Sequence, residues 1–256
     1  MATQQWDFFL VGVVFFNDQC SIMVTIKKAF LYNTAALLLI LLFQGCGDQH
    51  TPPDYYFPKP PPGEAYVYHY TSLTEGFPDE YWRVDHWSED RLRICIFDSA
   101  RGWIQCSYEY LSSTGVVQDK LLIFPGRGQT TSVDIEHGNL YPSEASDYNQ
   151  VYLQYLRWYT SPDSLTFTEI IRNRRFDPTQ STEDEVVFEL REKIEDFQEG
   201  YLEMESRGIE VFETGLGLRY FEKEITPEIV RKYTFSERFS VEDFNNRVNP
   251  EPVPEN

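Results

Sequence analysis

Hydrophobic and polar residues alternate in a series of short stretches between Ala65 and residue 176. A period of two places successive side chains on opposite faces of a strand, so each stretch predicts a strand with one buried face. Glycines recur every thirteen residues between several of them, at Gly102, Gly115 and Gly128. We therefore expect a mainly β domain that contains an antiparallel meander. The predicted strands are residues 66–70, 81–87, 91–98, 103–111, 116–124, 130–137, 151–159 and 165–176.

Two of the turns have the sequence of a three-residue hairpin loop. Residues 99–102 (Ser-Ala-Arg-Gly) and 112–115 (Ser-Ser-Thr-Gly) each end on a glycine, which takes a positive φ at little cost. With this loop Ile96 faces Cys106, and the two strands share one apolar face, while Cys95 lies on the other face. Because a slip of one residue moves every side chain to the opposite face, we predict no disulfide between Cys95 and Cys106.

The C-terminal part has a mixed pattern. Hydrophobic residues in 186–205 recur at spacings of three and four, which is typical of a helix, yet the segment continues into residues 209–224, which alternate as a strand. Residues 186–205 therefore fit either helix or strand. Residues 226–228 (Thr-Pro-Glu) have the composition of a helix start, with proline at the first helical position. Residues 240–247 predict another short helix.

A different pattern lies nearer the N-terminus. Lys27 and Lys28 precede a largely apolar run at residues 29–43, and Gly45 and Cys46 follow. Basic residues, an apolar run of about 7–15 residues and a small residue before the cleavage point make up an export signal. The run is shorter than the roughly 20 apolar residues that span a bilayer. With the cysteine placed directly after it, the segment resembles the lipobox of bacterial lipoproteins, which implies that Cys46 is acylated and begins the mature chain.

Two alternatives stay open in this region. An uncleaved anchor helix that is followed by a cysteine by chance would have the same sequence pattern. Residues 6–16 form a second apolar run, and an ordinary signal has only one. Translation from Met23 would give the simpler precursor.

The expected location of the protein in the cell follows from its lipid anchor. Acyl chains hold a protein at a bilayer because each buried methylene contributes about 0.8 kcal/mol. Gly47 rather than aspartate follows the cysteine, which in lipoproteins favours the outer membrane, on either its periplasmic or its surface face. Six prolines in residues 48–62 predict a semi-rigid spacer. The expected organisation is a signal peptide at 1–45, a lipidated Pro-rich tether at 46–64, an antiparallel β domain at 65–225, and short helices with a polar tail at 226–256.

The formal net charge of −19 limits the classes of partner that we expect this protein to bind. Binding to nucleic acid needs clustered cations, so we expect no nucleic-acid partner. The glycines at 126–128 and 215–217 lack the other residues of phosphate-binding and dinucleotide-binding loops. We predict no metal, no cofactor and no enzymatic activity. The histidines stand singly, without the spacing of a metal site, at His50, His69, His86 and His137.

Two short motifs resemble those of a family. Residues 56–58 (Tyr-Phe-Pro), followed by Gly63 and residues 66–68 (Tyr-Val-Tyr), are similar to the Y-F-P…G-x-x-W-x-Y opening of uncharacterised lipoproteins of Gram-negative bacteria. Residues 211–220 (VFETGLGLRY) look like their closing G-I-G-L-V strand. The resemblance implies a curved antiparallel sheet or half-barrel with no known activity. It also favours a strand for residues 186–197.

Aromatic residues, 16% of the chain, carry the remaining hint about function. Tyrosine and tryptophan combine an apolar ring with a polar tip and are common in binding surfaces. We take Tyr66, Tyr68, Trp82 and Trp87 as candidate ligand-binding residues, although core packing of a curved sheet explains the same pattern. The first hypothesis is a non-enzymatic, lipid-anchored domain that binds an apolar ligand or an envelope protein. The alternative is a surface glycan-binding module with exposed aromatic residues, and two facing carboxylates in a cleft would instead indicate an enzyme.

Overall fold

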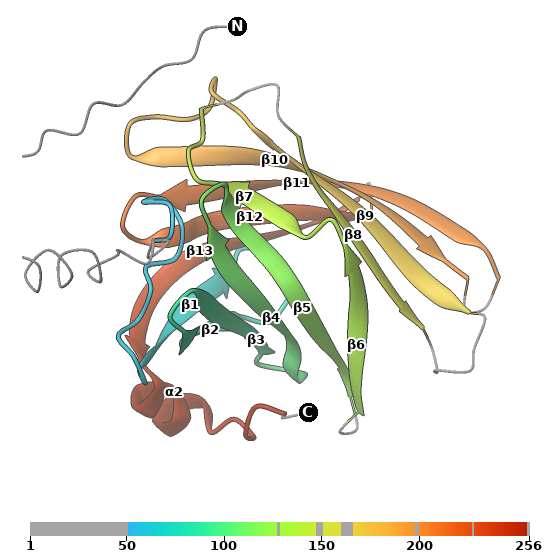
Figure 1. The fold of residues 1–256 in the computed structure, drawn as a ribbon. Coiled ribbons are helices and arrows are strands. Elements are labelled where there is room, and N and C mark those ends of the chain that lie inside the picture. The colour runs from blue at the N-terminus through green and yellow to red at the C-terminus, as the bar shows by residue number, and fades with distance from the viewer. Residues whose placement is uncertain are drawn as a thin grey trace, which may run out of the picture. The chain divides into compact units, whose positions relative to one another are not determined.

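The computed structural model describes residues 51–126, 129–146, 151–159, 166–197, 200–226 and 228–254, and the predicted signal peptide and Cys46 lie outside these ranges. Gln49–Asn256 forms one compact unit. Its described residues contain a single antiparallel sheet and a short helix (Figure 1). The elements are β1 (Ala65–Ser72), β2 (Glu80–Ser88), β3 (Arg91–Asp98), β4 (Gly102–Ser112), β5 (Gly115–Gly126), β6 (Gln129–Glu136), β7 (Asn139–Pro142), β8 (Val151–Tyr159), β9 (Phe167–Phe176), β10 (Glu185–Asp196), β11 (Leu202–Glu213), β12 (Gly217–Thr226), β13 (Ile229–Ser240) and α2 (Val241–Val248).

The strands close into a ring. Their order is β4-β3-β2-β1-β13-β12-β11-β10-β9-β8-β6-β5, and β5 pairs again with β4. These 12 strands form an antiparallel barrel within the described residues, and the short β7 runs beside the first residues of β5. The predicted mainly β, antiparallel fold is confirmed. The expected half-barrel is a complete ring because the last strand, β13, pairs with the first strand, β1.

The meander from β3 to β5 has glycines at its turns as predicted. Gly102 and Gly115 have positive φ angles of 86° and 135°, which a residue with a side chain adopts only with strain. At Gly115 a Cβ atom would also lie 2.0 Å from the backbone oxygen of Tyr141, because β7 crosses close to this turn.

The prediction that Cys95 and Cys106 remain apart is wrong, because the two residues form a disulfide. Phe97 pairs with Trp103 next to the turn, and a β-bulge between Ile96 and Phe97 then shifts the register. The bulge places Cys95 opposite Cys106 and leaves Ile96 opposite Gln105 rather than Cys106. The sequence argument allowed only one apolar face. In the structure both faces of β3 are buried, so apolar character does not distinguish the two registers.

The ambiguous segment is strand, since Glu185–Asp196 and Leu202–Glu213 form the hairpin β10–β11. The helix expected from residue 226 onward is wrong, because Ile229–Ser240 is strand β13. Its backbone pairs with β1 and with β12, which outweighs the local signal for a helix start. The second predicted helix is confirmed as α2, whose first turn is capped by Ser240, the acceptor of a hydrogen bond from the Asp243 backbone N–H.

The proline-rich segment was expected to be a spacer up to residue 64, but part of it lies in the core. Tyr55, Tyr56 and Phe57 are 5%, 3% and 2% exposed. The backbone N–H of Gly215 donates to the oxygen of Asp54 at 2.8 Å. At Gly217 a Cβ atom would lie 2.8 Å from the Phe57 ring. The two motifs near the ends of the domain therefore pack against each other.

A second apolar layer covers the outside of β1–β5. Helix α2 and the tail after it lie against this wall, with Phe244 1% exposed. The indole N–H of Trp103 donates to the backbone oxygen of Glu251 at 2.7 Å. The Cys95–Cys106 disulfide belongs to the same buried cluster. The helical residues of the described chain do not include a segment with the length and hydropathy needed to cross a bilayer.

Candidate functional site

The barrel interior contains a cavity of about 280 Å³. Residues of β2–β5 and of β9–β13 line it, together with Tyr56 and Phe57 from the N-terminal segment. Small-molecule sites usually have volumes of roughly 300–1,000 Å³, so this cavity suits a small ligand. Its lining is mixed: charged side chains of β9–β12 stand among apolar residues of β10–β12, and isoleucines of β3 and β4 stand among polar residues of β2, β4 and β5.

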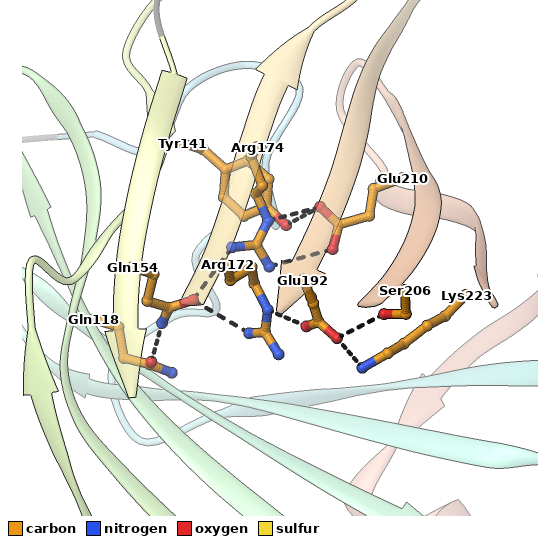
Figure 2. Close-up of polar contacts among 9 residues, drawn as sticks. All are labelled: Gln118, Tyr141, Gln154, Arg172, Arg174, Glu192, Ser206, Glu210 and Lys223. Atoms are coloured by element: carbon orange, nitrogen blue, oxygen red, sulfur yellow. Dashed lines mark hydrogen bonds and ion pairs between the residues drawn. The ribbon is translucent and has the colours of Figure 1, made fainter. Parts of the chain in front are cut away.

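Arg174 of β9 holds the first charged group in place (Figure 2). Its Nε donates to Glu210 Oε2 at 2.8 Å and its Nη2 donates to Oε1 at 3.3 Å. The hydroxyl of Tyr141 donates to the same carboxylate at 2.7 Å. Burial alone would lower the pKa of Arg174, but the neighbouring Glu210 and Tyr141 outweigh burial and raise it. Both oxygens of the Glu210 carboxylate therefore have hydrogen-bond donors.

Glu192 of β10 is the centre of a second charged group, also drawn in Figure 2. Arg172 and Lys223 both form ion pairs with its carboxylate, and the hydroxyl of Ser206 donates to Oε2 at 3.3 Å. The Glu192 side chain is 1% exposed, against 21% for Arg172 and 31% for Lys223. Burial alone would raise the pKa of Glu192, but the two cations lower it to about 2. Two cations thus share one buried carboxylate at the wall of the cavity.

Uncharged side chains connect both charged groups to the far wall. Gln154 Oε1 accepts hydrogen bonds from the two arginines, at 3.2 Å from Arg172 and 3.4 Å from Arg174. The amide of Gln154 donates to Gln118, whose own amide donates to Ser107. These hydrogen bonds link Gln154, Gln118 and Ser107 into one connected polar layer.

Glu109 of β4 ends this network. It accepts from the Ser107 hydroxyl at 2.7 Å and from the hydroxyl of Tyr56. Burial raises the pKa of Glu109, and the two hydrogen bonds only partly oppose that rise. Burial likewise holds the pKa of the Tyr56 hydroxyl well above its usual range, so Tyr56 acts as a donor. The N-terminal segment is therefore joined to the polar layer as well as to the apolar core.

Three of the four candidate residues named from the sequence lie together, since Tyr68 pairs with Trp82 across β1 and β2 and Tyr66 packs on the same apolar cluster, whereas Trp87 lies apart. Tyr68 is fully buried in the core, and Trp82 lines the cavity while its indole N–H donates to Glu80 at 3.0 Å. Tyr66 is half-buried, with the guanidinium carbon of Arg238 4.7 Å from its ring centroid. Of the four, Trp82 alone lines the cavity.

Trp87 lies on the outer surface and is 51% exposed. The guanidinium carbon of Arg93 is 4.6 Å from its ring centroid, and the ring of Tyr108 stands at 84° to it. A glycan-binding platform would present these rings side by side in one plane, which is not their arrangement.

Sequence reasoning missed the charged residues of the cavity. The sequence did contain a sign that these residues face inward. Arg172 and Arg174 lie on the same strand face as the apolar Ile170 and Phe176. A charge at a core position requires a partner. The partner of Arg174 is Glu210 on β11, and sequence spacing does not connect residues on non-adjacent strands.

The histidines and acidic residues of the described chain form no group of three or more that could hold a metal ion. His69 contacts Asp79 at 2.9 Å and stacks on Tyr81, with ring centroids 4.6 Å apart. His50 lies outside the described residues.

No family model, curated protein or solved structure matches this chain. The barrel and its cavity are therefore interpreted from their own geometry and chemistry.

Proposed function

We propose that this protein binds one small ligand inside its barrel without chemical conversion, and that lipid on Cys46 holds it at the outer membrane. The observation that carries the first part is the cavity of about 280 Å³ within the ring of strands. A binding site of this kind needs an apolar wall and a few fixed polar groups. Ile94, Ile96 and Ile104 supply apolar surface, and the charged side chains around Glu192 and Glu210 supply the polar groups.

The contacts of the cavity carboxylates weigh against an enzymatic role. The carboxylates of Glu192 and Glu210 are both engaged in ion pairs, so neither is free to act as an acid or a base. The role that suits them is to fix the cations at the cavity wall. The hypothesis of a surface glycan-binding module has no supporting arrangement around Trp87 and is kept only as an alternative outcome of the test.

Native mass spectrometry of Gln49–Asn256, purified without denaturation, tests the binding function. We expect a retained small-molecule mass that is lost on extraction with organic solvent. A domain that is always empty would contradict the proposal, and glycan arrays would then be the next measurement.

A matched pair of variants sharpens this experiment. Ile104→Trp places a larger side chain in the cavity and should expel the ligand. Ile171→Trp is the control, because its neighbour Ile170 packs on the interior cluster with Leu156 and Ile171 therefore faces the other way. Equal retention by both variants would mean that the mass is bound somewhere other than the cavity.

Lipid attachment is tested separately. Labelled palmitate should enter the full chain and be absent from Cys46→Ala, and the labelled protein should fractionate with the outer membrane. Label in the variant would refute the assignment of Cys46. Peptides from residues 2–22 in the unprocessed precursor would refute a start at Met23.

A further inference from the structure

The cations around Glu192 have more hydrogen-bond donors than the described residues use. Arg172 has five N–H donors, and its contacts engage Nε with Glu192 and Nη1 with Gln154. Lys223 has three donors and one contact, with Glu192. Both side chains are partly exposed, whereas the carboxylate that they share is buried. The group that would complete this wall is an acceptor with negative charge.

A third cation stands beside these two. Arg231 of β13 pairs directly across the ladder with Lys223 of β12, so both side chains leave the same face of the sheet. Arg231 lines the cavity, its guanidinium carbon is 4.5 Å from the ring centroid of Phe77, and its buried Nε has no hydrogen-bond partner within the described residues. Like charges placed opposite each other are unfavourable unless something negative lies between them.

One more carboxylate, Glu80, shares this part of the cavity. It accepts a hydrogen bond from the indole N–H of Trp82, and no ion pair joins it to Arg231 among the described residues. Burial raises the pKa of Glu80, and the hydrogen bond from Trp82 and the charge of Arg231 partly oppose that rise.

Gly208 stands beside Lys223, where the sheet leaves no room for a side chain. A Cβ atom there would lie 2.3 Å from the backbone oxygen of Glu222 and 3.4 Å from the side chain of Leu190. Gly208 pairs with Lys223 on the next strand, and Lys223 forms its ion pair with Glu192.

Three isoleucines lie across the barrel from these groups, beside the polar residues Gln105, Ser107 and Glu109 of β4. In the strand order β3 and β4 stand opposite β10 and β11, and Ile94, Ile96 and Ile104 belong to them. A ligand that contacts both the cations and the isoleucines has an anionic end and an apolar end.

We propose that the ligand is a small amphiphile whose anionic oxygen group, a carboxylate or a phosphate, binds Arg172 and Lys223 while its apolar part contacts Ile94, Ile96 and Ile104. This inference rests on the proposed binding function. Without ligand, Glu192 is the shared partner of the two cations, and it competes with the anionic group of the ligand for them.

Isothermal titration of Gln49–Asn256 with octanoate, octyl phosphate, octanol and octyltrimethylammonium tests the proposal. At least one anionic probe should bind about tenfold or more tightly than octanol, because hydrogen bonds to charged groups are worth that much in affinity. The stronger of octanoate and octyl phosphate identifies the head group. Arg172→Gln and Lys223→Gln should each weaken it by about tenfold to a hundredfold and leave octanol unchanged.

Glu192→Gln separates recognition from a folding defect. Removing this carboxylate frees both cations, so the anionic probe should bind more tightly, which a damaged site would not do. Arg219→Gln is the control, because Arg219 pairs with Glu185 and Glu213 and is half exposed. It should leave every affinity unchanged.

Two results would overturn the proposal. Equal affinities for octanol and the anionic probes, unaffected by the variants, would refute the anionic head group and leave the binding function standing. Failure of all four probes to bind would also refute this ligand class, and the search for a retained mass would then decide the binding function independently.

Discussion

The two walls of the barrel differ in what lies outside them. The wall of β1–β5 is buried on both faces, by the interior core on one side and by α2 and the C-terminal tail on the other. The wall of β9–β12 faces the interior on one side, and its outer face carries exposed ion pairs such as Lys193 with Glu195 and Glu203. The charged residues that line the cavity around Glu192 and Glu210 belong to this second wall.

This difference explains where the alternation of apolar and polar residues along the sequence reveals the structure of a strand. In β3, residues 94–98 are all buried, so apolar side chains occupy both faces and do not reveal the register. In β10, charged residues occupy both faces, with Glu192 inside and Lys193 outside. The pattern therefore located β3 as a strand but did not determine its register, and in β10 it did not distinguish strand from helix.

The largest expected loss of stability comes from breaking the buried ion pair of the second wall. Arg174→Met leaves Glu210 buried without its cation, and should lower the free energy of unfolding by about 3–5 kcal/mol. Urea unfolding measures the change. Arg219→Met removes an exposed partner of Glu185 and should cost at most about 1 kcal/mol. Similar small losses in both variants would mean that the interior is as wet as the surface.

Acidification should affect two carboxylates of the interior in opposite ways. The pKa of Glu192 is lowered from 4.5 to about 2, so its contribution, on the order of 3 kcal/mol, is present above pH 4.5 and is lost as the pH falls towards 2. The pKa of Glu109 is raised, so its contribution is present below its ordinary pKa and is lost as the pH rises through the folded value.

Urea unfolding at a series of pH values checks these signs. The stability deficit of Glu192→Gln should shrink between pH 5 and pH 2, and Glu109→Gln should gain stability relative to the wild type as the pH rises. Parallel pH curves for the two variants and the wild type would contradict the different environments assigned to these carboxylates.

The outer layer of the first wall is tested through its disulfide, whose cysteines are separated by 11 residues. Cys95→Ala/Cys106→Ala should lower the free energy of unfolding by about 2–3 kcal/mol, because the open chain regains entropy when unfolded. Reduction of the wild-type domain should add the mass of two hydrogens. An unchanged mass after complete reduction would refute the disulfide and restore the register expected from the sequence.

The smallest effect concerns the start of α2. Ser240→Ala removes the acceptor for the Asp243 backbone N–H and should cost about 1 kcal/mol. Ser88→Ala removes an exposed hydrogen bond to Asp90 and should change stability by less than about 0.5 kcal/mol. Thermal unfolding compares the two, and equal losses would mean that α2 does not depend on this cap.

The sequence was sufficient for the fold class because strand periodicity and turn glycines are local signals. The helix Val241–Val248 was also predictable, since Ser240 and Asp243 carry its cap within four positions. The disulfide register and strand β13 were not predictable in this way. A bulge beside Phe97 sets the register of the disulfide, and pairing with the edge of β1 makes residues 229–240 a strand. Both are properties of the assembled sheet.

The candidate site was less accessible still. Arg174 and Glu210 lie on β9 and β11, so they meet across an intervening strand. Abundant acidic residues in the chain conceal those few that occupy interior positions. Only the ring of strands shows which charges face inward, and so which of them act together.

The closure of the barrel also sets the order in which the molecule can be assembled. Nearly every other ladder joins strands that are near neighbours in the chain, whereas Tyr66 of β1 pairs with Ser240 at the end of β13. During synthesis this seam has to wait for the last strand, because long-range contacts form only after the intervening chain is available. Until then the apolar edge of β1 is unprotected, which exposes the growing chain to mispairing. The barrel can therefore close only late in synthesis, in the single step that pairs β13 with β1.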